Sequence, residues 1–419
     1  MLMKKCRSTF RIAAGMLVLG LFLAGSVNAA KNLMVCPGGC TYSSIQKAIN
    51  ASSNGDTISV QSGTYFENVN VTKKIILRGI GMPVVDAGGN GSAITLAVDG
   101  ITIEGFTVIW GWDGDYYSST SAGIRVTSNN NIIVKNNASN NYNGIRFCFS
   151  VNNTLMNNNA LNNDIGIYLE SSNNNKLSNN NASNNDIGIY LDSSSNNTMK
   201  GNKASSNSGN GISIYDSSNN TMIDNNASNN NDAGIFLLYS SSNNKIYNNI
   251  LNNTNNFHFF ESNNNTWNTT IQTGANIIAG SYLGGNFWAN PKGTGFSQTC
   301  KDMNGDGICD KSYILDGNNN DYLPLAKDKI PPKSVSNLKN VSYASSYINW
   351  TWKDPKNIDF RKVMVFIDGK FTGNVSKGKR YYNATNFPAN TKHIISTWTV
   401  DWNGNINKTW TNRSAWTAK

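Results

Sequence analysis

The stretch NNDIGIYLESSNNNKLSNNNASNNDIGIYLDSSSNNT, from Asn162 to Thr198, contains nearly the same asparagine-rich phrase twice. The phrase belongs to a longer repeat, because glycines recur every 21 to 23 residues, at Gly123, Gly144, Gly166, Gly188, Gly211 and Gly234. Self-similarity at such a period is typical of a solenoid in which each repeat forms one turn. The repeat therefore predicts a chain that stacks turn upon turn.

Apolar and polar side chains alternate in the short run after each glycine, which predicts a strand. The inward positions form a core column of Ile145, Phe147, Ile167, Leu169, Ile189, Leu191, Ile212, Ile214, Ile235 and Leu237. Runs such as NNIIVKNNA predict a second strand in each turn. The leucine spacing of a leucine-rich horseshoe is not found, and a disordered asparagine-rich tract would not keep apolar residues in register. The sequence predicts an all-β parallel β-helix.

Asparagine recurs at the corners of the predicted turns. It tolerates the left-handed backbone conformation that a sharp corner requires. Its amide can also hydrogen-bond to the same amide one turn further on, at a spacing of about 4.8 Å. The asparagine repeat therefore predicts that each turn has the same corner conformation as the next and is hydrogen-bonded to it through equivalent asparagines.

Residues 1–30 have the pattern of a secretory signal peptide. Four basic residues precede the apolar run AAGMLVLGLFLAGSV, and the small-residue site VNAA follows. The apolar run is shorter than the ~20 residues of a spanning helix. We expect cleavage near Ala29, no transmembrane segment afterwards, and a protein that is secreted or at the cell surface. The next segment, TYSSIQKAINAS, has Ile45, Ala48 and Ile49 at helical intervals, which predicts a short helix capping the first turn.

Charge divides the chain at the proline pair of DKIPPKSVSN. Residues 329–419 contain 15 Lys and Arg and 4 Asp, or 15 − 4 = +11, whereas residues 31–328 contain 16 and 21, or 16 − 21 = −5. Alternating runs such as SYINWTW and HIISTWTVD predict a small β-sandwich in residues 329–419. The pattern resembles fibronectin type III-like domains, which implies a spacer or anchor. Export favours an anionic envelope polymer over nucleic acid as a partner.

Two further stretches resemble a known family. They are CPGGCTYSSIQKAINASSNGDTISVQSGTYFENVNV, from Cys36 to Val71, and GGNFWANPKGTGFSQTCKDMNGDGICDKSYILDGNNNDYLPL, from Gly284 to Leu325. With the asparagine-rich turns between them, they resemble the NosD-like right-handed parallel β-helix proteins of the pectin-lyase-like superfamily. The resemblance implies a β-helix with its cap over residues 31–275 and a closing segment over residues 276–328, ahead of the sandwich.

NosD-type proteins are associated with maturation of a copper centre, and copper sites need clusters of His, Cys or Met. The predicted β-helix has one histidine, His258, and Met156, Met199 and Met222 fall at inward core positions. We therefore do not expect copper handling.

The same superfamily contains polygalacturonases and pectate lyases, so a polysaccharide lyase or glycoside hydrolase acting on an acidic polysaccharide is the alternative function. Glycoside hydrolysis uses carboxylates about 5 Å or about 6.5–9.5 Å apart. The repeat itself stacks Asp164 on Asp186 and Glu170 on Asp192, and the catalytic motifs of the hydrolases are not found. We interpret these carboxylates as solvated residues. No catalytic residue is named, and a non-catalytic surface protein is favoured.

An outward row on the predicted strands suggests a binding face. Its members are Arg125, Arg146, Tyr168, Tyr190 and Phe236, and the insertion IWGWDGDYYSS adds Trp110 and Trp112. Aromatic rings stack on sugar faces, and guanidinium groups pair with acidic groups. The row predicts binding of a polysaccharide or glycoconjugate of the cell envelope. Alternatively, an outward aromatic row only supports strand formation.

The loop DMNGDGICD has the spacing of a calcium site. Asp302, Asn304, Asp306, the carbonyl of Ile308 and Asp310 fall at positions 1, 3, 5, 7 and 9 of an EF-hand-like loop. Position 12 is Tyr313 rather than glutamate, so we predict a structural calcium ion of modest affinity. An acidic turn without metal is the other interpretation. The close pairs Cys36 with Cys40 and Cys300 with Cys309 could form disulfides in an oxidising exterior.

Overall fold

The structure is a computed structural model, and it describes residues 29–114, 121–304, 306–357 and 359–419. Residues 1–28 of the predicted signal peptide lie outside this part. The described chain forms two compact units. The β-helix unit contains residues 29–268, Trp288–Phe296 and Tyr313–Asp321, and the C-terminal unit contains Thr269–Phe287, Ser297–Ser312 and Tyr322–Lys419. The predicted closing segment, residues 276–328, is thus divided between the two units.

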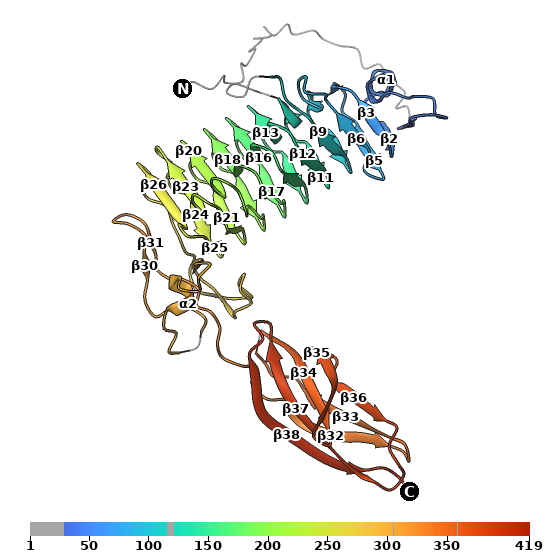
Figure 1. Cartoon of the computed structure of the whole chain (residues 1–419), viewed down its shortest axis with the longest axis vertical. Coiled ribbons are helices and arrows are strands. Elements are labelled where there is room, and N and C mark those ends of the chain that lie inside the picture. Colours follow the sequence, from blue (N-terminus) through green and yellow to red (C-terminus); the bar gives the residue numbers. More distant parts are fainter. Residues whose placement is uncertain (1–28, 115–120, 305, 358) are drawn as a thin grey trace, which may run out of the picture. The chain divides into compact units, whose positions relative to one another are not determined.

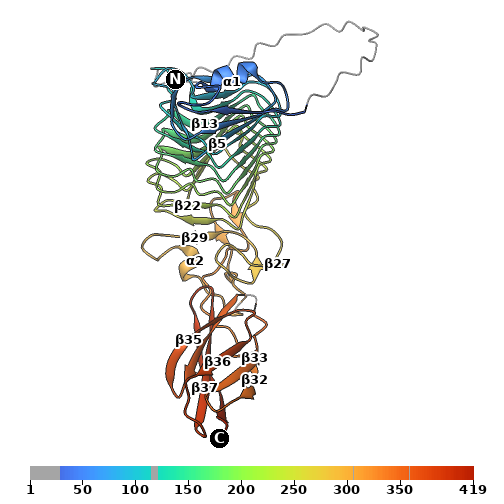
Figure 2. The ribbon, with the colours of Figure 1, turned by 90° about the vertical axis from the view of Figure 1, so that its right-hand side faces the viewer.

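The β-helix unit is a parallel β-helix. Its coils stack on one another, as Figures 1 and 2 show, and equivalent strands of successive coils pair to form long parallel sheets. The predicted fold class is confirmed. The first sheet has ten strands, namely β1 (Asn32–Val35), β2 (Thr57–Gln61), β5 (Ile76–Ile80), β8 (Thr102–Glu104), β11 (Ile132–Val134), β14 (Thr154–Met156), β17 (Lys176–Ser178), β19 (Thr198–Lys200), β21 (Thr221–Ile223) and β24 (Lys245–Tyr247). The second has nine, namely β4 (Val69–Val71), β7 (Ile94–Leu96), β10 (Ala122–Val126), β13 (Asn143–Cys148), β16 (Ile165–Glu170), β18 (Ile187–Asp192), β20 (Ile212–Tyr215), β23 (Ile235–Leu238) and β26 (Phe257–Phe260).

A third sheet was not predicted. Its five strands are β3 (Thr64–Phe66), β6 (Val84–Asp86), β9 (Thr107–Ile109), β12 (Asn137–Ser139) and β15 (Asn159–Leu161), and β22 (Asn226–Ser228), β25 (Ile250–Asn252) and β29 (Phe287–Ala289) form a separate sheet of three. In the repeats, a single inward alanine such as Ala138 or Ala160 supplies the core contact. One small apolar residue in three gives too little alternation to be recognised as a strand.

The core is built from columns of aliphatic residues in register from coil to coil. Ile145, Ile167, Ile189 and Ile212 pair successively in the nine-stranded sheet and are buried, as predicted. Leu155, Leu177, Met199, Met222 and Ile246 form the corresponding column of the ten-stranded sheet. The core position predicted for Met156 is wrong. Met156 is half-buried, because Leu155 occupies the inward position of that strand.

Asparagine performs its two predicted roles at neighbouring positions. The first residue of most NN pairs has a left-handed backbone, as at Asn157 (φ 57°) and Asn179 (φ 53°). The second is buried, and its Oδ1 accepts hydrogen bonds from the asparagine one coil before it. Asn158, for example, donates its backbone N–H and its Nδ2 to Oδ1 of Asn180, at 3.0 and 3.1 Å. Each corner therefore both turns the chain and joins the coils.

A short helix covers the first coil, as predicted. Helix α1 (Ile45–Ala51) buries Ile45, Ala48 and Ile49, and the Ser44 hydroxyl accepts the backbone N–H of Lys47 as an N-cap. It lies at the blue end of the coils in Figures 1 and 2. This helix covers apolar side chains that an open solenoid end would expose.

Aromatic residues close the last coil of the β-helix unit. Trp267 and Trp288 are buried with ring centroids 5.7 Å apart. Their indole N–H groups donate to Asn319 at 3.0 Å and to Asp321 at 2.8 Å. These contacts hold β30 (Tyr313–Ile314) and β31 (Asn320–Asp321) against the last coil. Residues of the GGNFW and NNND motifs therefore cover this end of the apolar core.

The C-terminal unit contains β27 (Gln272–Thr273), β28 (Tyr282–Leu283), residues 297–299 of α2 (Phe296–Thr299) and two antiparallel sheets. One sheet has β32 (Ser336–Tyr343), β33 (Tyr347–Lys353) and β36 (Tyr381–Thr385); the other has β34 (Phe360–Ile367), β35 (Lys370–Ser376), β37 (Lys392–Asp401) and β38 (Ile406–Trp416). Ile348, Trp350, Phe360 and Val365 lie in their shared core. No helix in the described ranges is both long and apolar enough to cross a membrane.

Candidate functional site

The outward side chains of the nine-stranded sheet form one row. Strand register aligns Arg125, Arg146, Tyr168, Tyr190, Ser213, Phe236 and His258. The five predicted members of this row therefore do lie in line. They differ in exposure, and this decides which of them a ligand can reach.

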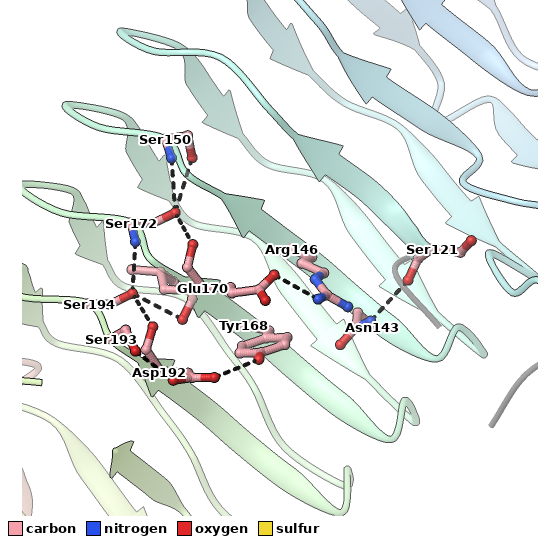
Figure 3. A network of polar contacts seen from close by, with 11 residues as sticks. Ser121, Asn143, Arg146, Ser150, Tyr168, Glu170, Ser172, Asp192, Ser193 and Ser194 are labelled. Carbon is pink, nitrogen blue, oxygen red and sulfur yellow. Dashed lines mark hydrogen bonds and ion pairs between the residues drawn. The ribbon is translucent and has the colours of Figure 1, made fainter. Parts of the chain in front are cut away.

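Arg146 and Tyr168 are buried in a polar network, which Figure 3 shows. The Arg146 guanidinium donates to the Glu170 carboxylate at 2.8 Å, and both side chains are 4% exposed. The Arg146 Cζ atom lies 4.6 Å from the Tyr168 ring centroid, and the Tyr168 hydroxyl donates to Asp192 at 3.3 Å. The prediction that Arg146 and Tyr168 are surface-exposed is wrong, because these side chains bind one another across neighbouring coils.

The same network engages Glu170 and Asp192, two of the four carboxylates considered as catalysts. The prediction that Glu170 is solvated is wrong, because its side chain is buried against Arg146. Glu170 accepts from Arg146, and Asp192 accepts from Tyr168 and from the Ser193 hydroxyl at 3.0 Å. Burial raises the pKa of the Tyr168 phenol, which keeps the phenol a neutral donor. The arrangement links three adjacent coils, and the Glu170 and Asp192 carboxylates accept hydrogen bonds from within the protein.

The row is more accessible on both sides of the buried Arg146 and Tyr168, although Ser213 is also buried, and it is most open in the last coils. Arg125, Tyr190 and Phe236 are half-buried. Phe236 stacks on the exposed His258 with ring centroids 4.8 Å apart, and Tyr239 lies against Tyr215 and Phe260 at 5.2 and 5.1 Å. Four further ring residues of this surface were not predicted, because they lie outside the repeated aromatic position or beyond the regular repeat; they are Tyr215, Tyr239, His258 and Phe260. Together they give this end of the face an aromatic surface.

Trp110 and Trp112 line a separate cleft. Trp110 is 51% exposed and Trp112 is 39% exposed. The cleft has a volume of about 280 Å³, and its other lining residues are Asn140, Asn141, Tyr142, Asn162 and Asp164. Hydrogen bonds fix the backbone at both tryptophans, since the Trp110 backbone N–H donates to the Asn140 carbonyl at 3.1 Å and the Trp112 carbonyl accepts the Gly91 N–H at 2.6 Å. Exposed rings thus face amides and a carboxylate.

The predicted calcium loop is closed by a disulfide between Cys300 and Cys309, and a second disulfide joins Cys36 to Cys40. The Asp302 carboxylate accepts the backbone N–H groups of Asp306 and Gly307 at 3.1 and 2.9 Å. The Asp306 carboxylate accepts the backbone N–H of Ile308 at 2.8 Å, and the Asp310 carboxylate accepts the backbone N–H of Met303 at 3.2 Å. Asn304 accepts the N–H of Asp306 at 3.2 Å. The side-chain oxygens predicted as calcium ligands therefore accept hydrogen bonds from backbone N–H groups of the same loop.

An acidic cluster elsewhere in the C-terminal unit was missed. Asp328, Asp359 and Asp401 place one carboxylate oxygen each within 4.8 Å of one another. In the part of the chain that is described, no other three His, Cys, Asp or Glu residues converge in this way. The three residues are 31 and 42 positions apart in the sequence, so no local motif marks them.

The described residues do not fit a copper site. The ring of His258 stacks on Phe236, and His393 pairs with Asp368 at 2.6 Å. Met199 and Met222 are fully buried among aliphatic residues. Copper favours clustered imidazole and sulfur ligands, whereas the one set of His, Cys, Asp or Glu that converges within the described ranges is made of carboxylates alone.

Comparison with known proteins gives a family for more than half of the chain. Residues 49–293 match the model of NosD, described as periplasmic copper-binding protein. A cell surface glycoprotein of Methanothermus fervidus is 32% identical over 119 residues, which are 27% of this chain and only 19% of that protein. The structure is similar to that of the pectate lyase Pel9A, with 14% identity and a TM-score of 0.45 over 57% of this chain and 80% of that one. It is also similar to the periplasmic alginate epimerase AlgG, with 17% identity and a TM-score of 0.37 over 51% of this chain and 60% of that one. The chain belongs to the NosD family and is an extracytoplasmic β-helix protein.

Proposed function

We propose that this protein is a non-catalytic module of the cell surface whose β-helix binds a polysaccharide or glycoconjugate of the envelope. The observation that carries the proposal is the pair of exposed indoles, Trp110 and Trp112, over a cleft lined by asparagine amides. Indole faces stack on the apolar faces of sugar rings. Amides next to them can donate to and accept from sugar hydroxyls.

The charges near the cleft favour a neutral polysaccharide over an acidic one. Arg146, the cation expected to pair with acidic groups, is bound to Glu170. Asp164 lines the cleft, and residues 31–328 have a net charge of 16 − 21 = −5. An acidic glycan would therefore be repelled at this position.

Changing the two indoles tests the proposal. We expect Trp110→Ala and Trp112→Ala each to weaken binding of a neutral envelope polysaccharide about tenfold, because about 1.4 kcal/mol of stacking corresponds to a factor of ten. Binding is measured by affinity electrophoresis with the full chain. The control is Phe66→Ala, which removes another exposed ring of the β-helix unit and should change nothing.

Undiminished retention of both tryptophan variants would contradict the binding proposal. A separate incubation with acidic polysaccharides tests the alternative function, a lyase or hydrolase acting on an acidic polysaccharide. If new reducing ends or unsaturated products form from polygalacturonate or alginate, the protein is an enzyme and Glu170 and Asp192 become the first residues to change.

The basic sandwich is proposed as the spacer or anchor of the β-helix. Residues 329–419 have a net charge of 15 − 4 = +11, and Lys370, Lys377, Lys379 and Arg380 are exposed. Exposed cations of this kind attract anionic polymers at low salt. This role involves a different surface from the tryptophan cleft and does not depend on it.

For the loop from Asp302 to Asp310 we propose a structural calcium ion, supported by its ligand spacing and by Gly307, whose φ of 80° allows the sharp turn. Calcium at ten times its dissociation constant should stabilise the C-terminal unit by about 1.4 kcal/mol. Asp302→Ala should remove this part of the stabilisation, measured as the shift in melting temperature between calcium and chelator. Lys301→Ala is the control, and an equal shift in the Asp302 variant would contradict a calcium loop.

A further inference from the structure

Three carboxylates meet where the linker enters the sandwich. Asp328 lies in the linker after β31, Asp359 directly precedes β34, and Asp401 is the last residue of β37. Asp328 is half-buried, whereas Asp359 is 7% exposed and Asp401 is fully buried. Two hydrogen bonds fix the backbone here, because the Trp402 backbone N–H donates to the Asp359 carbonyl at 3.0 Å and the Asn405 side-chain amide donates to the Asp328 carbonyl at 3.1 Å.

The charge of the cluster is not balanced by the protein. Residues 329–419 have four aspartates, of which Asp354 pairs with Arg380 at 3.5 Å and Asp368 with His393 at 2.6 Å. Neither Asp359 nor Asp401 makes an ion pair with any Lys, Arg or His in the described ranges. Buried carboxylates without a counter-charge are costly. The cluster therefore requires a cation or bound protons.

One oxygen of the cluster has no hydrogen-bond donor among the described residues. It is the Oδ1 atom of Asp359, which is buried. Asp401, by contrast, accepts the backbone N–H of Asn405 at 2.8 Å and its side-chain amide at 2.9 Å, and Asp328 accepts the N–H of Ile330 at 2.8 Å. A buried polar atom without a partner is rare in folded proteins, and a bound ion is one of its regular explanations.

A small cavity adjoins Asp328 and Asp359 of the cluster. Its volume is about 60 Å³, and it is lined by Asp306, Gly307, Asp328, Asn357 and Asp359, with Gly280, Ser281 and Ile330. A water molecule occupies about 30 Å³ in the liquid, so the cavity has room for an ion and a water. The side-chain donors facing it are oxygen-rich, which suits a hard divalent cation. Burial and the neighbouring carboxylates of Asp328 and Asp401 raise the pKa of Asp359 to about 6, so a proton is the competing occupant.

We propose that Asp328, Asp359 and Asp401 bind one divalent cation, calcium in preference to magnesium. Calcium accepts irregular sets of six to eight oxygens, whereas magnesium requires a near-octahedral set. The ion ties the linker to β34 and β37. The site is distinct from the disulfide-closed loop, although Asp306 of that loop also lines the cavity.

The test uses the full chain carrying Asp302→Ala, which removes a ligand of the loop site but none of the cluster. After chelation and dialysis, calorimetric titration with calcium chloride is expected to show one site with a dissociation constant of about 0.1–1 mM, as in extracellular calcium modules. Adding Asp359→Asn, which keeps the shape and removes the charge, should weaken binding at least about tenfold. Adding Asp368→Asn, which changes an aspartate hydrogen-bonded to His393 outside the cluster, should leave binding unchanged.

Magnesium is titrated in parallel and should bind more weakly than calcium. Equal calcium affinity with and without Asp359→Asn, or no calcium binding in the Asp302→Ala chain, would overturn the proposal and indicate that the cluster holds shared protons. If the Asp359 variant does not fold, Asp328→Asn provides the same comparison, because Asp328 is half-buried on the linker. The proposed loop site is tested separately by comparing the unmodified chain with the Asp302→Ala chain. Equal total calcium binding by these two proteins would contradict the loop site.

Discussion

The Asn180→Asp variant should lose about 3–5 kcal/mol of stability, since it breaks a buried network and leaves a charge without a partner. Asn180 Nδ2 donates to the Leu155 carbonyl at 2.9 Å and to Oδ1 of Asn202 at 3.0 Å. An aspartate of the same shape would turn an acceptor oxygen toward these two acceptors. The measurement is the midpoint of urea unfolding, followed by the circular dichroism of the β-helix.

Asn174→Asp is the matched control, because it makes the same chemical change at an exposed corner. Asn174 has a φ of 56°, a conformation that aspartate also tolerates. This variant should unfold within about 0.5 kcal/mol of the natural protein. Similar midpoints for the two variants would mean that the buried amide ladder does not hold the coils together.

Ile189→Asp should be comparably damaging, for a different reason. Ile189 is fully buried between Ile167 and Ile212, its partners in the coils on either side. A carboxylate there would have no hydrogen-bond partner in a dry column, and the expected loss is about 4–5 kcal/mol. Thermal unfolding measures the effect.

Thr198→Asp, on the exposed side of β19 in the same coil, is the control for Ile189→Asp. It should leave the melting temperature within a few degrees. A melting temperature for Ile189→Asp equal to that of Thr198→Asp would show that the coils do not stack in the register described.

The fold could be predicted largely because the repeat presents the same evidence many times. The inward column through Ile167 and Ile189 was visible from alternation, and its exact coil period fixes which residues pair. The third sheet could not be seen, since each of its repeat strands contributes one alanine to the core. The different roles of the two asparagines in each NN pair could not be predicted either. Two identical residues do not indicate which one adopts the left-handed backbone and which one is buried and bonds to the next coil.

The candidate sites were predicted unevenly. Trp110 and Trp112 stood out because they interrupt the repeat, and both are exposed. Arg146 and Tyr168 have the same alignment as predicted, but their burial depends on contacts between coils that periodicity does not reveal. Asp328, Asp359 and Asp401 come together only when the sandwich folds. Distance along the chain concealed them from any motif search.

The asparagine ladder has a consequence for the length of the molecule. Asn158, Asn180 and Asn202 occupy equivalent positions in successive coils, each bonded to the next in the same way. A coil inserted or removed as a whole would meet an equivalent asparagine on both sides, so the ladder itself would remain continuous. Each such event would change the length of the β-helix by about 4.8 Å, the spacing of hydrogen-bonded strands. Gene duplication within the repeat can therefore adjust how far a surface protein of this kind extends, in equal steps.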